Sequence, residues 1–112
     1  MAGDDTMRHQ LVLQFAGDSD EDLANVIGIE DALIEQLDAK RAAVDGHEVG
    51  DGVINLMLLA KDAMALWEEL ESFVEKRSAD GPELAAVAYR ELDSDEYTVL
   101  WPEDYDGEFV AD

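Results

Sequence analysis

The chain has 112 residues and a formal net charge of −22, from 29 Asp and Glu against 7 Lys and Arg. This length predicts one domain spanning residues 1–112, and the lack of cysteine excludes disulfides, zinc ribbons and thiol nucleophiles and favours a reducing cytoplasm. No apolar run approaches the ~20 residues that a membrane helix needs, so we expect a soluble protein with no membrane partner.

The first expected element is a strand within "RHQLVLQFAG", residues 8–17. Leu11, Leu13 and Phe15 alternate there with a second set of side chains that includes two glutamines. This period of two is typical of a half-buried strand. The strand should therefore turn its three large apolar side chains into the core.

A helix is expected to follow, with Ser19 as its N-cap and Asp22 in the first turn. Its apolar residues recur at spacings of three, four and seven, which predicts one apolar stripe. The stripe consists of Leu23, Val26, Ile27, Leu33, Ile34 and Leu37. Lys40 and Arg41 should close this helix, because cations complement the negative end of a helix dipole.

The glycine-rich stretch "DGHEVGDG", residues 45–52, predicts a hairpin with "GDG" at 50–52 as a three-residue loop. The next strand, "VINLMLLA", is apolar almost throughout, which favours an interior position in the sheet. A three-residue loop would pair Val49 with Val53 and His47 with Asn55.

This pairing would bring Asp45, His47 and Asn55 to one face of the sheet. A histidine beside a carboxylate can act as a general base or bind a metal, so these residues are the sequence's candidate catalytic group. His9, the other histidine, lies at the far end of the first strand and adds nothing to the group. We therefore favour a glycine-rich turn over a site, and we expect no cofactor and no metal.

A second helix should begin after Asp62, its N-cap, and end at "SADGP", residues 78–82. Lys76 and Arg77 would close it. Its apolar stripe has nearly ideal helical spacing and consists of Ala63, Leu66, Trp67, Leu70, Phe73 and Val74.

Two further strands are expected at residues 84–92 and 97–101, joined by the turn "DSDE". The termini, residues 1–7 and 103–112, are expected to be frayed. In the acidic C-terminal segment, the side chains expected to pack against the rest of the domain are Tyr105, Phe109 and Val110.

The element order β-α-β-β-α-β-β predicts an α+β sandwich of the ferredoxin-like kind. Its two helices would cover one face of an antiparallel sheet of four or five strands. The other face would then carry a mixed set of apolar and amide side chains, which are Gln10, Val12, Gln14, Val53, Asn55, Met57, Val87 and Tyr89. Because such surfaces seldom stay uncovered, we expect a homodimer or a complex with a protein partner through this face.

The acidity has two competing explanations. Its spread along the whole chain resembles the halophilic composition of proteins from organisms that accumulate molar salt. The alternative is an acidic surface that captures a basic partner or imitates nucleic acid. A functional patch should be local, and this charge is not, so we favour the first explanation. Nucleic-acid binding is not expected, because Arg8, Lys61 and Arg90, the three cations away from predicted helix ends, form no cluster.

The run "DGHEVGDGVINLML", followed by Asp62 and an amphipathic helix, resembles a DGHxxGxGxxN-type motif of small uncharacterised bacterial proteins with ferredoxin-like α+β folds. The resemblance covers residues 45 to about 75. It implies the same fold class for this chain. It implies no functional residue, since the motif carries no established activity.

The sequence thus supports three classes of function. The leading one is a non-enzymatic protein-interaction or regulatory module that acts through its sheet face. A sharper version is an immunity-like inhibitor of a basic toxin. The enzyme alternative is a metal-dependent activity that uses Asp45 and His47.

Overall fold

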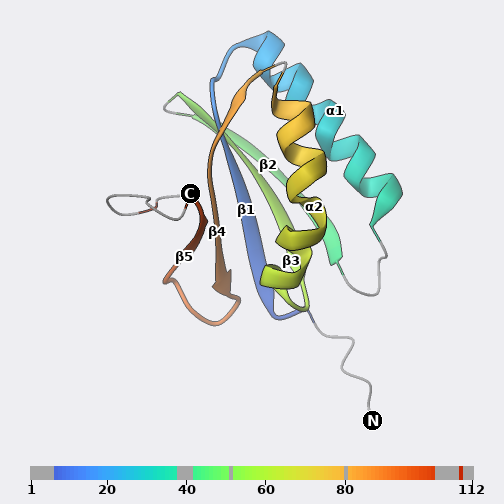
Figure 1. Cartoon of the computed structure of the whole chain (residues 1–112). Coiled ribbons are helices and arrows are strands. Elements are labelled where there is room, and N and C mark those ends of the chain that lie inside the picture. The colour runs from blue at the N-terminus through green and yellow to red at the C-terminus, as the bar shows by residue number, and fades with distance from the viewer. Residues whose placement is uncertain (1–6, 38–41, 51, 80, 103–108, 110–112) are drawn as a thin grey trace.

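The structure is a computed structural model, and it describes residues 7–37, 42–50, 52–79, 81–102 and 109. Within these residues the chain forms five strands and two helices (Figure 1). In chain order they are β1 (His9–Ala16), α1 (Asp20–Gln36), β2 (Ala42–Gly50), β3 (Val53–Ala60), α2 (Ala63–Ser78), β4 (Glu83–Glu91) and β5 (Thr98–Trp101).

The described strands build one sheet in the order β2-β3-β1-β4-β5, and all neighbouring strands are antiparallel. As a result β1 and β2 run in the same direction with β3 between them, and β3 and β4 do so with β1 between them. These are two split β-α-β units, as in a ferredoxin-like fold. The predicted α+β class and the predicted order of elements are confirmed, and β3 is interior as expected.

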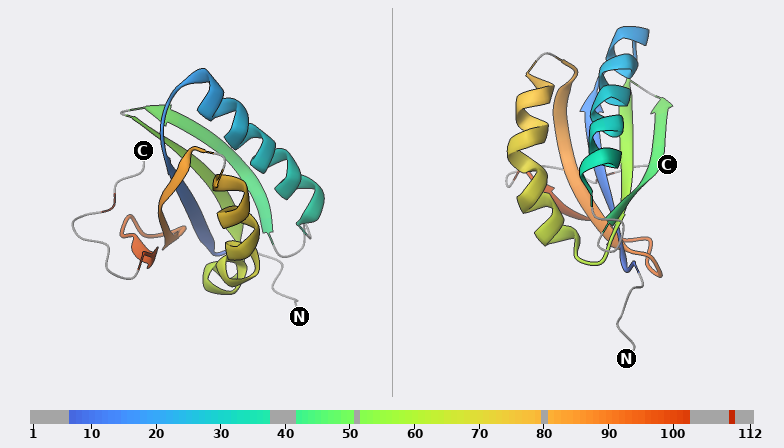
Figure 2. Two further views of the ribbon diagram at one scale, coloured as in Figure 1. Left: turned by 45° about the horizontal axis from the view of Figure 1, so that its top comes forward. Right: turned by 90° about the vertical axis from the view of Figure 1, so that its right-hand side faces the viewer.

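Both helices pack on the same face of the sheet (Figure 2). α1 lies over β2 and β3, whereas α2 lies over β4, β1 and β3. Each helix begins where the sequence predicted. Ser19 accepts a hydrogen bond from the backbone N–H of Asp22 at 3.1 Å, and the Asp62 side chain accepts one from the N–H of Ala65 at 3.2 Å.

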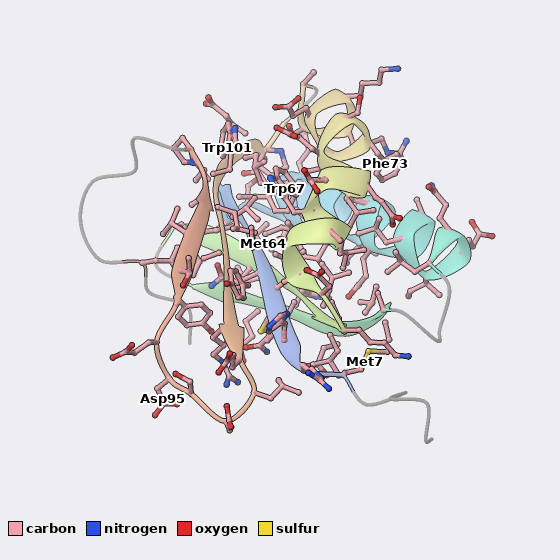
Figure 3. All side chains as sticks on the ribbon, turned by 60° about the horizontal axis from the view of Figure 1, so that its bottom comes forward. Met7, Met64, Trp67, Phe73, Asp95 and Trp101 are labelled. Carbon is pink, nitrogen blue, oxygen red and sulfur yellow. The ribbon has the colours of Figure 1, made fainter. Side chains whose placement is uncertain are left out.

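The core lies between this face and the two helices. β1 and β3 contribute alternate side chains to it, and all of them are fully buried: Leu11, Leu13, Phe15, Ile54, Leu56 and Leu58. Trp67 of α2 packs into the same core and is only 6% exposed (Figure 3). The period-two and helical patterns of the sequence therefore converge on one core, because each places its apolar side at the same interface.

The predicted stripe of α1 is wrong in one place. Ile29 is buried and Ile34 is 58% exposed, so the buried line runs through Val26, Ile29 and Leu33. The physical reason is that α1 lies toward one edge of the sheet, where only a narrow strip of the helix meets β2 and β3. The stripe of α2 is confirmed, with Phe73 only partly buried.

The predicted end of α1 is also wrong. The helix ends at Gln36, and its last turn contains no basic residue. Lys40 and Arg41, which were expected to close it, lie outside the described residues. In α2, by contrast, Lys76 and Arg77 do occupy the last turn, as predicted. Neither helix, over the residues that the structure describes, is long and apolar enough to cross a lipid bilayer.

Candidate functional site

The register of the β2–β3 hairpin differs from the prediction. Gly50 pairs with Val53, and His47 pairs with Leu56 instead of Asn55. Two residues, not three, therefore separate the paired ends of the strands, and Gly52 in this connection has a φ of 82°. Two-residue loops with positive φ are the commonest hairpin connections, because their twist matches that of the strands.

A shift of one residue moves a side chain to the opposite face of a sheet. His47 consequently lies on the helix-covered face, while Asn55 lies on the other face opposite Glu48. Asp45 falls at a β-bulge between Val44 and Gly46, where the register shifts. The predicted grouping of Asp45, His47 and Asn55 on one face is therefore wrong.

His47 has a different partner. Its ring Nδ1 lies 3.2 Å from the Glu30 carboxylate of α1, and the two side chains are 30% and 13% exposed. This contact ties β2 to α1 beside the core. Sequence reasoning missed Glu30, because no spacing rule connects a residue in the middle of a helix with one in a later strand.

The described residues contain no group of three or more His, Cys, Asp or Glu side chains that could hold a metal ion. His9 is held separately at the end of β1, where its Nδ1 accepts a hydrogen bond from the backbone N–H of Ala63 at 3.0 Å. Its ring also packs edge-on against Tyr89, with 5.0 Å between the ring centroids. The two histidines thus serve separate local structures.

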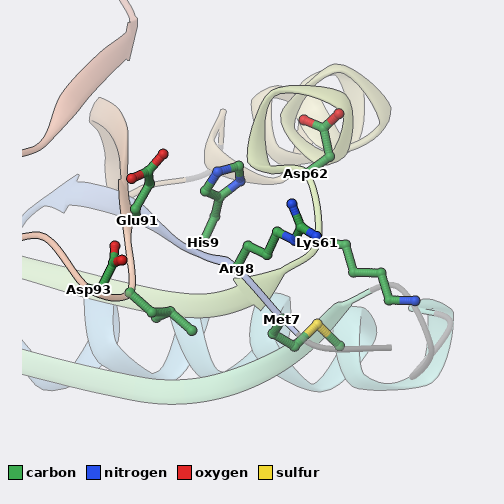
Figure 4. A pocket seen from close by; sticks show the side chains of 8 residues that line it. Met7, Arg8, His9, Lys61, Asp62, Glu91 and Asp93 are labelled. Carbon is green, nitrogen blue, oxygen red and sulfur yellow. The ribbon is translucent and has the colours of Figure 1, made fainter. Parts of the chain in front are cut away.

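A hollow of about 590 Å³ surrounds His9 at this end of the sheet (Figure 4). Its charged walls come from β1, the α2 N-terminus and the end of β4, and they are Arg8, Lys61, Asp62, Glu91 and Asp93. Arg8 and Lys61 both have further interactions. Charges of both signs are therefore mixed here, and the hollow has no single electrostatic preference.

The face of the sheet away from the helices, here called the open face, carries most of the predicted interface residues. Cross-strand pairing places Val12 beside Met57, and Gln14 beside Asn55. Gln10 lies on this face too, and so does Val53, which pairs with Ala16. These six positions of β1 and β3 follow the predicted alternation.

The assignment of Val87 and Tyr89 to this face is wrong. They pair with Leu13 and Leu11, so they point toward the helices, and Val87 is fully buried in that core. The open face receives Ala86, Ala88 and Arg90 instead, which pair with Gln14, Val12 and Gln10. The sequence of β4 does not show which of its side chains face the helices, because both of its faces carry apolar residues and no alternation is visible.

Side-chain amides satisfy one another on the open face. Gln14 Nε2 donates to Asn55 Oδ1 at 3.0 Å. Gln10 Oε1 accepts from Arg90 Nε at 3.0 Å and from the Tyr97 hydroxyl at 3.4 Å. Gln10 and Asn55 are only 9% and 7% exposed. Such pairing allows amides to be buried without a large desolvation cost.

One half of the open face is covered by the chain itself. Phe109 is 7% exposed and packs in a second apolar cluster with Val12, Ala86 and Ala88. Its ring lies 5.1 Å from that of Tyr97. Residues 103–108 and 110–112, including Tyr105 and Val110, lie outside the described residues, as do residues 1–6, so the expected fraying of the termini stays a prediction.

The open face also contains a hollow of about 580 Å³, here called the open-face hollow, which extends from β2 to the β4–β5 connection. Its lining residues are Gln10, Asp45, Gly46, His47, Glu48, Met57, Arg90, Asp95 and Tyr97. His47 belongs to this lining although its Nδ1 contacts Glu30. Figure 3 shows Asp95 on the β4–β5 connection, well away from Trp67 and Phe73 of α2.

The open-face hollow is acidic. Asp45, Glu48 and Asp95 are all exposed, and none of them makes a hydrogen bond or ion pair with another described residue. The guanidinium of Arg90 is already occupied, since its Nη1 donates to the backbone oxygens of Glu91, Leu92 and Ser94. These carbonyls are uncharged and leave the positive charge of Arg90 in place, but the three carboxylates outnumber this one guanidinium among the described lining residues.

Comparison with protein-family models, curated proteins and solved structures found no match to this chain. The resemblance of residues 45 to about 75 to small bacterial proteins stays a prediction.

Proposed function

We propose that this chain is a non-enzymatic interaction module, in a cytoplasmic setting, that binds a protein partner through the open-face hollow. The observation that carries the proposal is the contrast within this face. Phe109 packs on Val12, Ala86 and Ala88, and Met57 and Tyr97 lie at the border of this cluster. Beyond that border, no described residue covers the hollow that Met57 and Tyr97 line. A partner would complete the cover, as expected for a mixed apolar and polar surface.

The charge of this surface favours a basic partner over a second copy of the chain. A two-fold dimer brings the same patch of both copies together. It would place the exposed carboxylates of Asp45, Glu48 and Asp95 against their own equivalents, and like charges in contact oppose association. A partner with Lys or Arg at the matching positions would be attracted to the same surface.

An immunity-like inhibitor of a basic toxin is the sharper form of this proposal. It predicts tight binding that weakens as salt rises, because the Debye length falls from about 8 Å at 0.15 M to about 3 Å at 1 M. The metal-dependent enzyme is less well supported, since the hairpin register separates His47 from Asn55 and pairs His47 with Glu30.

The test compares two variants that each gain one positive charge at an apolar position. Met57→Arg fills the open-face hollow, whereas Ile34→Arg changes an exposed site on α1. Each chain is immobilised and used to capture proteins from its native cells, and the retained protein is then purified. We expect its affinity to fall at least tenfold for Met57→Arg and to stay unchanged for Ile34→Arg.

Sedimentation of the chain alone is the companion measurement. A dimer that Met57→Arg disrupts would make the occupant a second copy and overturn the preference for a basic partner. A captured protein that binds both variants equally would remove the open face from the proposal altogether.

A further inference from the structure

We infer that the open-face hollow binds a single extended basic side chain, Lys or Arg, of a protein partner, together with a carbonyl of that partner's backbone. This inference rests on the proposed function and names its ligand. The acidic residues of the hollow alone would not support this inference, because exposed carboxylates are spread over the protein as a whole. Three further features single out this hollow.

The first feature is the amide of Gln10. This side chain is only 9% exposed, and its Oε1 is fixed toward Arg90 and Tyr97, both of which can donate to it. The amide nitrogen Nε2 consequently points the other way, and it has no hydrogen-bond partner among the described residues. Every fully buried side-chain polar atom of the described residues has a hydrogen-bond partner. Because Nε2 has none, it is not fully buried, and we infer that it faces the hollow that Gln10 lines.

An unpaired N–H at the bottom of a hollow is a specific donor. It fits a carbonyl oxygen of a ligand, and a ligand without an acceptor would leave it unsatisfied at a cost in affinity. A simple cation lacks such an acceptor. A peptide carries a carbonyl next to every side chain, so it offers both the acceptor and the charge.

The second feature is the sign of the charge. Asp45, Glu48 and Asp95 line the hollow with three carboxylates that have no described cationic partner, and they outnumber the one guanidinium there, which backbone oxygens orient toward the β4–β5 connection. A Lys or Arg head group would meet these carboxylates at the rim. The three residues come from β2 and from the β4–β5 connection, so the cation would lie between two walls.

The third feature is the floor. Met57 of β3 lies between Val12 of β1 and Gly46 of β2, and its thioether offers an apolar and adaptable surface. The methylene stem of a Lys or Arg side chain packs well on such a surface while its charged head stays at the rim. The hollow therefore offers a donor for a backbone carbonyl at Gln10, an apolar surface for a stem at Met57 and carboxylates for a cationic head on two sides.

The probe is Nα-acetyl-lysine N-methylamide, which carries the backbone carbonyls, the stem and the charge. It is titrated by NMR into the isotope-labelled full chain at low salt. We expect millimolar binding that shifts the side-chain NH₂ signals of Gln10 and the methyl signal of Met57. The norleucine analogue, which keeps the stem and lacks the charge, should bind at least tenfold more weakly.

The matched variants are Glu48→Gln in the hollow and Glu68→Gln on α2, which remove the same charge from two exposed sites. Glu48→Gln should weaken binding of the lysine probe about two- to fivefold, the range for one exposed ion pair. Glu68→Gln should leave it unchanged. Equal effects of both variants, or shifts confined to the helix surfaces, would show non-specific attraction to an acidic protein and overturn the inference.

A titration with spermidine distinguishes a basic side chain of a protein partner from a free polyamine as the ligand of the hollow. If spermidine binds more tightly than the lysine probe and the Gln10 NH₂ signals do not respond to the probe, the ligand is not a peptide side chain. The test of the proposed function does not depend on this result. Met57→Arg can abolish partner capture even when no basic side chain enters the hollow.

Discussion

The two faces of the sheet are built from alternate residues of the same strands, and they are stabilised differently. On the helix-covered face, Leu11, Leu56 and Leu58 are fully buried beneath α1 and α2. On the open face, Gln10 and Asn55 are almost as deeply buried, and their amide oxygens accept hydrogen bonds from Arg90 and Gln14. The helix-covered face is thus packed with apolar side chains. The open face is covered by Phe109 in one part and contains a hollow in another.

This difference shows how one sheet can serve both stability and recognition. Dense apolar packing gains free energy from every side chain, and it leaves no room for a ligand. Amides and a single docked aromatic, Phe109, gain less but leave polar groups available beside them. The comparison predicts that mutations on the two faces have unequal effects, which can be measured.

The largest contrast is expected between two adjacent leucines of β3. Leu58 is fully buried on the helix-covered face, whereas Leu59 pairs with Gln10 on the open face and is partly exposed. Leu58→Ala should lower the free energy of unfolding by about 2–5 kcal/mol, because it leaves a cavity in the core. Leu59→Ala should lower it by about 1 kcal/mol. Urea denaturation of both variants checks this, and equal losses would contradict the assignment of faces.

Phe109 is expected to be the largest contributor on the open face. Phe109→Ala should lower the free energy of unfolding by about 1.5–3 kcal/mol, because a buried aromatic ring is lost. The NMR methyl signals of Val12, Ala86 and Ala88 should shift in the folded variant. Phe109→Leu is the control and should recover most of the stability. An unchanged transition midpoint would mean that the ring does not cover this face in solution.

The amide pair should have a smaller effect. Asn55→Ala removes the 3.0 Å hydrogen bond from Gln14, for which we expect a coupling energy of about 1 kcal/mol. A double-mutant cycle with Gln14→Ala isolates this term from the other contacts of Gln14. A coupling energy near zero would show that the amides on the open face are satisfied by water and not by each other.

The contact between His47 and Glu30 should have the smallest effect, because both side chains keep some access to solvent. Their coupling energy should be about 0.5 kcal/mol and should decrease with added salt. A more sensitive measurement is the NMR shift of the His47 ring. Glu30→Gln should change this shift and Asn55→Ala should not. The reverse result would place His47 on the open face, as the sequence first suggested.

Much of the fold could be predicted from local patterns. The alternation in β1, the apolar run of β3, the caps Ser19 and Asp62 and the stripe of α2 each follow from residues close together in the sequence. Local chemistry decides these features, since a cap or a period of two acts within a few residues.

The candidate site could not be predicted in the same way. One loop residue more or fewer in the β2–β3 hairpin decides whether His47 faces α1 or the open face, and the glycine-rich loop fits either length. The contact with Glu30 and the docking of Phe109 join segments that lie far apart in the chain. Neither leaves a signal in residue spacing.

The sequence by itself determined the element order, the helix starts and the apolar sides of β1, β3 and α2, because these depend on short-range geometry and on the burial of apolar surface. Only the tertiary structure decided strand register, the face of each β4 residue, the partner of His47 and the open-face hollow. The physical reason is that side-chain direction alternates with every residue along a strand. A difference of one position, too small to change any local pattern, therefore exchanges the two faces.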